Sequence, residues 1–299
     1  MKRRDFIGTG ASLFASYCVL QNFSLSAMPV VKEIIKKNKS RVGIQLYSVK
    51  DDLLNDFTGS LRKLSDMGYT SVEAYGFDGN LFLGKRLKEL SSILKGMDMT
   101  LSGTHTGTGV LPVNTNAKEW DFWKKCCDEV KSAGGKRVIQ AWLPEPKTMD
   151  ELKKLTDHYN RVGEICQKAG IKFGHHNHSA EMKKVGGTVL FDYLIQNTDP
   201  SLVFFQFDFG HALEAGADCI AYIKKYPGRF TCWHATDHKM NVGSIELGRG
   251  DVDYDSLFKL ANWAGLEELS VEQESGEDRF ASCKIDFEYL RKYPWAEIK

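Results

Sequence analysis

The 299-residue sequence lacks the features that mark several common classes of protein. It has no CxxC pair, which disfavours a zinc ribbon or a dithiol redox site. Neither sign of charge predominates, because 40 lysines and arginines are balanced by 39 aspartates and glutamates, so a nucleic-acid or anionic-membrane partner is not indicated. No apolar run is long and uninterrupted enough to span a bilayer. With 42% hydrophobic and 26% charged residues, the composition is that of a globular protein.

The first 27 residues have the layout of an export signal. A basic start is followed by a weakly apolar segment and then by small residues that end in SLSA. Arg3 and Arg4, followed by Asp-Phe-Ile, resemble a twin-arginine signal, which a receptor reads as an address. We expect residues 1–27 to be removed by cleavage near Ala27 and the mature protein to be exported to the periplasm. A short membrane anchor is the alternative, and the polar residues that interrupt the apolar segment weigh against it.

The seven cysteines show no spacing typical of a disulfide framework, although an exported protein can form disulfides. We expect buried free thiols with no role in metal binding. The cysteines are Cys18, Cys126, Cys127, Cys166, Cys219, Cys232 and Cys283.

Four helix-to-strand junctions repeat along the chain. In each, a helical pattern ends at a glycine and a β-rich run follows, and glycine adopts the left-handed conformation that ends a helix at little steric cost. The glycines are Gly68, Gly134, Gly170 and Gly265. Their separations of 66, 36 and 95 residues are close to two, one and three units of roughly 33 residues, about the length of one strand–helix unit.

Eight runs are candidate strands, and helical patterns with apolar residues three and four apart lie between them. The runs are residues 42–48, 70–76, 99–105, 137–142, 171–176, 202–208, 229–235 and 266–272. This alternation predicts a single-domain (β/α)8 TIM barrel over residues 41–299. A doubly wound open sheet is the alternative, and its dinucleotide-binding form is disfavoured because no GxGxxG follows the first run.

Polar side chains gather at the ends of the expected strands, and seven of the eight histidines lie there. The exception is His158, within a helical pattern. The carboxyl ends of barrel strands form the active-site face, so we expect these side chains to meet. In strand order they are Gln45 and Tyr47; Glu73; His105; Trp142; His176, Asn177, His178 and then Glu181; Asp208 and His211; His234 and Asp237; Glu272 and Glu274.

Imidazoles and carboxylates around one open position suit a divalent metal such as Mn, Zn or Co. Asp208 is the strongest candidate ligand, because an apolar strand ends at its carboxylate and a buried carboxylate needs a cation or several hydrogen bonds. Glu272 and His234 occupy similar positions. The alternatives are a carboxylate paired with Lys or Arg and a core histidine bonded to a backbone carbonyl.

The fourth ligand is expected from the fifth strand, and the residues leave the choice open. Glu181 reaching back from the following loop is one candidate, and direct ligation by His176 or His178 is the other. His175 is expected to point elsewhere, because neighbours on a strand alternate faces.

Other polar residues are candidates for substrate contact or proton transfer. His211 is better placed for a substrate hydroxyl than for a second metal, which would need further ligands. His105 is either a substrate contact or acid–base group or a hydrogen-bonded loop residue, and Arg249 is a candidate for an anionic group. The expected catalytic residues are Glu181, His178, His211 and Glu272. The expected substrate-binding residues are Gln45, Tyr47, Glu73, His105, Trp142, His176, His211 and Arg249.

From about Arg41 to the C-terminus the chain resembles the sugar phosphate isomerase/epimerase superfamily of xylose-isomerase-like barrels. The motifs are GIQLYSVKD, GIKFGHHNHSAEM, FDFGHALEAGAD, HATDHK and VEQE. The resemblance implies a metal held by a strand-five residue together with Asp208, His234 and Glu272. Epimerases of the family carry a strand-five glutamate and use two metal-bound glutamates as opposed acid and base. Here His176 stands at that place, as in the dehydratase-like branch, so another base, His178 or Glu181, would be needed.

Three functions follow as hypotheses. The first is a divalent-metal-dependent isomerase or epimerase of a keto-sugar or polyol, acting through an enediolate. The second is a metal-dependent dehydratase or lyase on a 3-keto-sugar or glycoside. The third is a carbohydrate-binding barrel without turnover, since exposed aromatic rings can stack on sugars. All three imply a small-molecule carbohydrate as partner, and an oligomer is possible.

Overall fold

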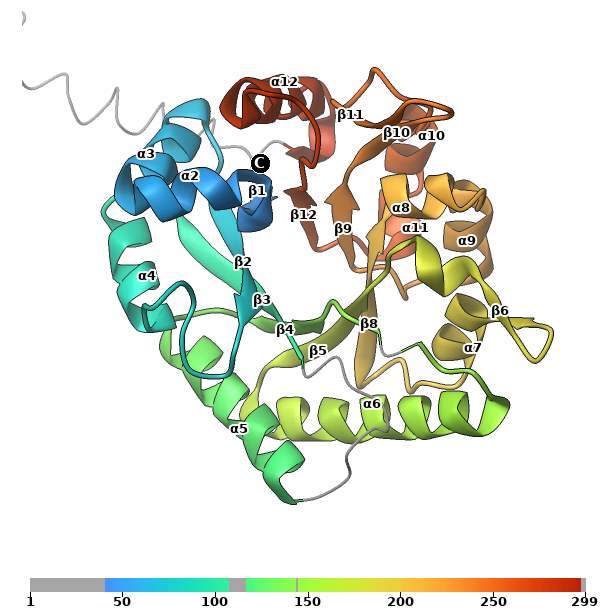
Figure 1. The fold of residues 1–299 in the computed structure, drawn as a ribbon. Coiled ribbons are helices and arrows are strands. Elements are labelled where there is room, and N and C mark those ends of the chain that lie inside the picture. The colour runs from blue at the N-terminus through green and yellow to red at the C-terminus, as the bar shows by residue number, and fades with distance from the viewer. Residues whose placement is uncertain (1–40, 108–116, 144, 297–299) are drawn as a thin grey trace, which may run out of the picture. The chain divides into compact units, whose positions relative to one another are not determined.

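The computed structural model describes residues 41–107, 117–143 and 145–296, and these form a closed barrel of eight parallel strands. The strands are β1 (Val42–Gln45), β2 (Ser71–Phe77), β3 (Thr100–Thr106), β4 (Arg137–Gln140), β5 (Lys172–His176), β8 (Val203–Asp208), β9 (Cys232–Ala235) and β12 (Glu268–Val271). Each pairs with its neighbours in the order β1-β12-β9-β8-β5-β4-β3-β2, so the first strand closes onto the last (Figure 1). The predicted TIM barrel is confirmed, while the expected export signal lies outside the described residues.

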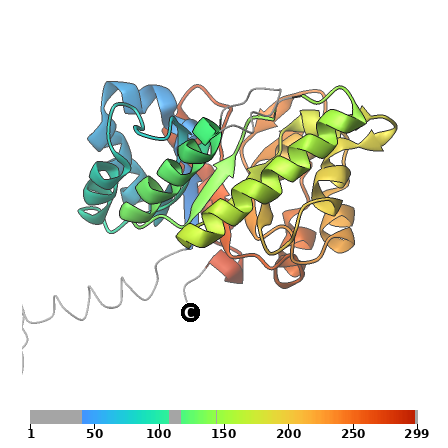
Figure 2. The ribbon, with the colours of Figure 1, turned by 90° about the horizontal axis from the view of Figure 1, so that it is seen from below.

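Helices surround the barrel. They are α2 (Lys50–Asn55), α3 (Phe57–Met67), α4 (Leu87–Lys95), α5 (Ala117–Ser132), α6 (Met149–Ala169), α7 (Leu190–Gln196), α8 (Phe209–Glu214), α9 (Cys219–Lys225), α10 (Tyr254–Lys259), α11 (Ala261–Ala264) and α12 (Arg279–Leu290), with 3-10 turns η2 (Leu46–Val49), η3 (Ser179–Met182) and η4 (Pro294–Ala296). The long helices α5 and α6 lie side by side outside the strands (Figure 2). Within the described ranges, no helix has both the length and the apolar character needed to cross a membrane.

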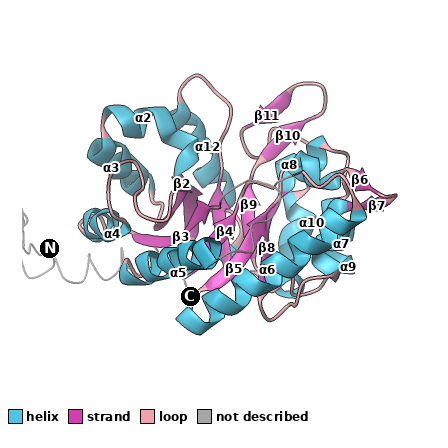
Figure 3. Ribbon diagram, turned by 60° about the horizontal axis from the view of Figure 1, so that its bottom comes forward, coloured by secondary structure: helices cyan, strands magenta, loops and turns pink. Residues whose placement is uncertain are grey.

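Two small hairpins extend the loops that follow strands β5 and β9. They are β6 (Lys184–Val185) with β7 (Thr188–Val189), and β10 (Asp237–Lys239) with β11 (Gly243–Ile245) (Figure 3). The Asp237 carboxylate fixes the second hairpin, because it accepts hydrogen bonds from the backbone N–H groups of His238, Gly248, Gly250 and Val252. The sequence patterns predicted neither hairpin.

Alternation along the strands separates an apolar shell from a polar interior. In β8, Phe205 and Phe207 belong to the main hydrophobic core, whereas Phe204 belongs to a separate cluster with Ile139 and Cys232. A Cβ atom at Gly174 would lie 2.5 Å from the Phe204 ring, so glycine on β5 makes room for that ring. Two residues beyond Phe204 and Cys232, on the same faces of their strands, come Gln206 and His234, which are polar and belong to the site.

The repeated glycine junctions are confirmed. Gly68, Gly134, Gly170 and Gly265 have φ angles of 109°, 79°, 76° and 73°, all in the region that other residues rarely adopt. The backbone N–H groups of Gly68 and Gly170 return to carbonyls at the ends of α3 and α6. The six described cysteines are buried and free, as expected, while Cys18 lies outside the described residues.

A buried ion pair closes the opposite end of the barrel from the expected site. Arg137 at the start of β4 pairs with Glu268 at the start of β12, and with Glu267 at 2.9 Å. Lys172 also contacts Glu267, at 2.7 Å, but its side chain is 54% exposed. Burial raises the pKa of Glu268, so this carboxylate depends on its cationic partner to stay ionised.

Replacing Arg137 with methionine is therefore expected to lower the free energy of unfolding by about 3–5 kcal/mol, because Glu268 is left as an unpaired buried carboxylate. Lys172→Met is the matched control, and the loss of its exposed pair should cost less than about 1 kcal/mol. Urea unfolding of both variants measures the difference. Equal losses would show that the buried pair contributes no more than the exposed one.

Candidate metal centre and adjoining cavity

Four side chains with metal-ligating atoms meet at the carboxyl ends of four strands. His176 ends β5, Asp208 ends β8, His234 lies in β9, and Glu272 directly follows β12. One ligand atom from each lies within 4.8 Å of the others, and all four residues are buried. The group contains the three residues expected from strands six to eight together with His176, the alternative ligand from strand five.

Asp208 presents one carboxylate oxygen to this group. Its Oδ1 accepts hydrogen bonds from the His211 backbone N–H and the Thr236 hydroxyl, both at 2.7 Å, and so caps α8. Its Oδ2 is buried and has no hydrogen-bond partner among the described residues. Asn177 fixes the backbone, because its side chain exchanges two hydrogen bonds with the main chain of Asp208. Such a rigid carboxylate with one unpartnered oxygen fits a metal ligand.

His176 is the second group with an unpartnered atom. Its Nδ1 is buried without a hydrogen-bond partner in the described part of the chain, and its Nε2 lies 3.9 Å from Glu272 Oε2. Burial and the neighbouring histidines, His234 first among them, lower the pKa of His176 well below its usual value. The imidazole is therefore neutral and keeps a lone pair, which is the form that binds metals.

His234 lies between two carboxylates. Its Nδ1 is 2.7 Å from Glu272 Oε2, and its Nε2 is 2.9 Å from Glu73 Oε1. Burial lowers the pKa of His234, but Glu272 and Glu73 outweigh burial and raise it well above the usual value. A ligating histidine whose second nitrogen contacts a carboxylate is held in one orientation and made more basic.

Glu73 anchors a polar layer below this group. Its Oε1 accepts a hydrogen bond from the Gln45 amide at 2.7 Å and lies 2.8 Å from His105 Nε2, while its Oε2 accepts from the Gln206 amide at 3.0 Å. Burial alone would raise the pKa of Glu73, but His105 and His234 outweigh it and lower the pKa far below the usual value. Glu73 is thus a fully buried carboxylate that remains ionised.

Glu181 lies outside the four-residue group. Its Oε1 is 3.1 Å from His175 Nε2, and its Oε2 accepts a hydrogen bond from the His178 backbone N–H at 3.0 Å. His175 points away from the barrel interior, as expected, and its Nδ1 contacts the Tyr159 hydroxyl at 3.0 Å. Both carboxylate oxygens of this candidate strand-five ligand thus contact β5 and the loop that follows it.

A cavity of about 210 Å³ opens above the group. Its lining residues are Tyr47, Tyr75, Gly76, His105, Ala141, Trp142, His176, His178, Glu272 and Glu274. Tyr47, His105, Trp142 and His176 were expected to contact substrate, and all four line it. The Trp142 ring is 65% exposed and stacks on His178 with the ring centres 5.3 Å apart.

Other residues expected at the site lie elsewhere. Gln45 and Glu73 are completely buried below the cavity and do not line it. Arg249 lies on an exposed loop, where it contacts Glu246 at 3.1 Å. His211 packs against His178, with ring centres 4.8 Å apart, and its Nε2 is 3.7 Å from Glu274 Oε2.

His178 and His211 differ in charge although they are neighbours. Burial lowers the pKa of His178 to about 4. Burial also lowers the pKa of His211, but Asp208 and the surrounding glutamates outweigh it and raise the pKa above the usual value. Near neutral pH, His178 can accept a proton while His211 carries one.

Sequence reasoning missed Gln206 and Thr236. Gln206 interrupts an apolar strand two residues before Asp208, and this spacing places both side chains on the inner face, so the signal was present. Thr236 bonds both Asp208 Oδ1 and the Gly210 backbone N–H. Nothing in its local sequence distinguishes it from an ordinary loop threonine.

Glu73→Gln is expected to lower the pKa of His234, because it removes one of the two carboxylates that raise it. Histidine titration by NMR on metal-stripped protein measures this change. His158, remote and with a pKa lowered to about 4 by burial, serves as an internal control. An unchanged His234 pKa would show that Glu272 alone stabilises the imidazolium.

Comparisons with known proteins agree with this architecture. Residues 61–293 match the family model described as xylose isomerase-like TIM barrel. A solved sugar phosphate isomerase/epimerase from Parabacteroides distasonis is 28% identical, with a TM-score of 0.78 over 87% of this chain and 96% of its own.

Curated relatives match over a shorter stretch. The inosose dehydratase of Clostridium perfringens is 28% identical over 146 residues, which cover 42% of this chain and 48% of that protein. That of Geobacillus kaustophilus is 33% identical over 111 residues, which cover 36% of this chain and 35% of that protein. The chain thus spans half or less of the length of these relatives. Because the family model covers most of the chain, the protein belongs to the xylose isomerase-like TIM-barrel family.

Proposed function

We propose that the protein is a divalent-metal-dependent enzyme that eliminates water or an alcohol from a keto-sugar or keto-polyol. His176, Asp208, His234 and Glu272 would hold the metal. The unpartnered Asp208 Oδ2 and His176 Nδ1 support this ligand set, since both atoms are buried and belong to residues of the four-residue group. A divalent ion there would polarise the substrate carbonyl and so make the adjacent C–H more acidic.

The position of Glu181 carries the choice of elimination over epimerisation. Moving a proton from one face of a substrate carbon to the other takes a base and an acid on opposite sides. Glu181 would be the second glutamate beside the metal, and both its oxygens are instead engaged by His175 and the His178 backbone. Elimination needs only one base and one proton donor, and both can lie on the same side of the substrate.

One residue of the cavity and one residue packed behind it suit these two roles. His178 lines the cavity, is held flat against Trp142, and is placed to remove the proton next to the carbonyl. His211 lies behind it, against Glu274, and would supply a proton to the departing oxygen. The buried loop contacts of Glu181 keep the His178 backbone in place. Tyr47 and Tyr75 offer ring faces and edges to the apolar side of a sugar.

Relatives of this chain support a dehydratase. The curated matches are inosose dehydratases, although this chain covers about half of their length. A direct test is to incubate metal-loaded protein with keto-inositols and 3-keto-sugars in heavy water and to follow the products by NMR. An unsaturated ketone product is expected. Deuterium incorporation with inversion and without elimination would contradict the proposal.

Epimerisation is the second candidate, and one observation favours it. Glu274 lines the same cavity as Glu272, so a second carboxylate is present although it is outside the ligand group. Burial and the nearby Glu272 raise the pKa of Glu274, which suits a proton donor. The heavy-water experiment separates the two candidates, because only epimerisation returns a substrate isomer.

Asp208→Asn is expected to weaken metal binding by more than about 100-fold, since changing partners that only orient a ligand already costs roughly 10–100-fold. Elemental analysis of protein purified without chelator measures the metal content. Asp121→Asn, on the exposed face of α5, is the matched control and should keep wild-type metal. Full metal content in the Asp208 variant would remove Asp208 from the ligand set.

His211→Ala is expected to lower kcat by about 10²-fold, the low end of the range for a proton-transfer group, with metal content unchanged. His238→Ala, on the β10–β11 hairpin, provides the control. Loss of metal in the His211 variant would instead indicate that His211 is a ligand, as in a two-metal site with His176 and His178.

A further inference from the structure

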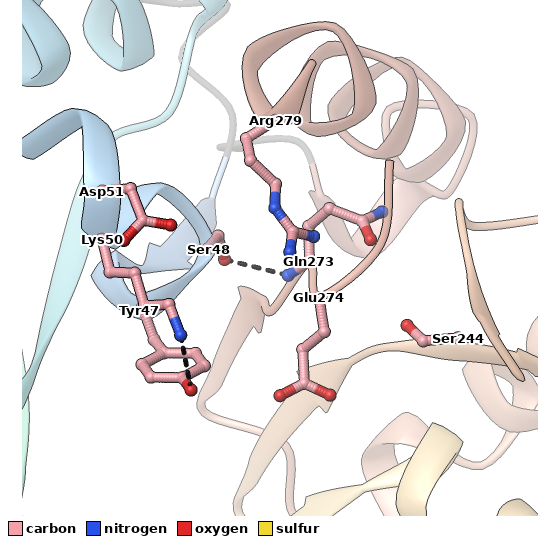
Figure 4. Close-up of a pocket in the computed structure, with 8 residues that line it drawn as sticks. All are labelled: Tyr47, Ser48, Lys50, Asp51, Ser244, Gln273, Glu274 and Arg279. Atoms are coloured by element: carbon pink, nitrogen blue, oxygen red, sulfur yellow. Dashed lines mark hydrogen bonds between the residues drawn. The ribbon is translucent and has the colours of Figure 1, made fainter. Parts of the chain in front are cut away.

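A second cavity, of about 330 Å³, lies at the barrel mouth, and Figure 4 shows the residues that line it. Its lining residues are Tyr47, Ser48, Lys50, Asp51, Ser244, Gln273, Glu274 and Arg279. They come from the segment after β1, the segment after β12, the hairpin strand β11 and the start of α12. None of these lining residues belongs to the four-residue group of candidate metal ligands.

Tyr47 and Glu274 line both cavities, so the two adjoin. The Tyr47 ring is held in place from two sides. It forms a T-shaped pair with Tyr75, with ring centres 5.4 Å apart, and Lys50 Nζ donates to its hydroxyl at 2.9 Å. A ligand that extends past this ring out of the first cavity enters the second.

The lining of the second cavity is polar but balanced in charge. Lys50 and Arg279 are opposed by Asp51 and Glu274. Ser48 and Gln273 are already bonded to each other, because the Gln273 backbone N–H donates to the Ser48 hydroxyl at 2.9 Å. The Arg279 side chain points into the cavity toward Glu274 (Figure 4). One of its N–H groups donates to the Ser275 carbonyl at 2.6 Å.

This lining fits a neutral polyhydroxylated ring better than an anion. The charged donors and acceptors of the lining can bond several hydroxyl groups, while Lys50 Nζ lies over the Tyr47 ring, 4.1 Å from its centre. A phosphate would meet Asp51 and Glu274 as well as the two cations. The first cavity, at about 210 Å³, is below the usual 300–1,000 Å³ of a small-molecule site, and the pair together lies within that range.

We propose that the second cavity binds a second sugar ring, so that the substrate is a glycoside with its keto ring in the first cavity and its other ring beyond Tyr47. This inference rests on the proposed function for the identity of the reacting ring. Arg279, Glu274, Asp51 and Ser244 are the residues that would bond the second ring.

Calorimetric binding of unreactive sugars tests the subsite without turnover. The probes are glucose, the disaccharides maltose, cellobiose and trehalose, and glucose 6-phosphate. At least one disaccharide should bind wild-type protein about tenfold tighter than glucose, which corresponds to about 1.4 kcal/mol. Arg279→Ala and the cavity-filling Ser244→Trp should abolish this advantage and leave glucose binding unchanged. Lys284→Ala, on an exposed position of α12, should behave as wild type.

Two results would overturn the subsite. One is equal binding of glucose and every disaccharide by the wild type. The other is tightest binding of glucose 6-phosphate, with loss in Arg279→Ala, which would make the cavity an anion site. Because binding is measured apart from reaction, disaccharide preference without turnover of any keto-sugar would overturn the proposed function alone. Turnover of keto-monosaccharides without disaccharide preference would overturn the subsite alone.

Discussion

The Glu73 carboxylate is the constraint on which the barrel interior depends. It is ionised and completely buried, and its oxygens are surrounded by the side-chain amides of Gln45 and Gln206 and by two imidazoles. Such a charge is stable in a protein interior only when every lone pair is matched. Meeting that requirement fixes the rotamers of His105 and His234, and these are the groups that bring the polar layer up to the cavity.

In the candidate ligand group above this layer, stability favours hydrogen-bonded polar atoms, whereas metal binding requires polar atoms without a protein partner. Asp208 is satisfied on one oxygen by a helix cap and a threonine and is left unsatisfied on the other, and His176 has an unpartnered nitrogen. Buried polar atoms without partners lower stability. Among the described residues, two such atoms belong to this ligand group, and others, such as Arg137 Nε and Glu268 Oε1, lie elsewhere in the barrel. The ion pair between Arg137 and Glu268 closes the far end, so the strands are held together where no ligand is expected.

The fold followed from the sequence because its signals are local. Glycines such as Gly68 end helices, and apolar runs with polar ends mark strands. The ligand group was predicted in part, since Asp208, His234 and Glu272 stand at strand ends. The position of Glu181 could not be predicted, because its partner His175 is reached only when the loop after β5 folds back. The second cavity was missed for a similar reason: Lys50 and Arg279 are over 200 residues apart.

Both cavities are lined by residues that follow β1 and β12, the first and last strands of the barrel, which pair with each other. β1 supplies the segment with Tyr47, β12 leads into Glu272 and Glu274, and the Gln273–Ser48 hydrogen bond crosses the same line. The pocket therefore does not exist until the end of the chain has docked onto its beginning. A ligand bound there would contact the segments that follow both β1 and β12, so occupancy would slow hydrogen exchange most in these two strands.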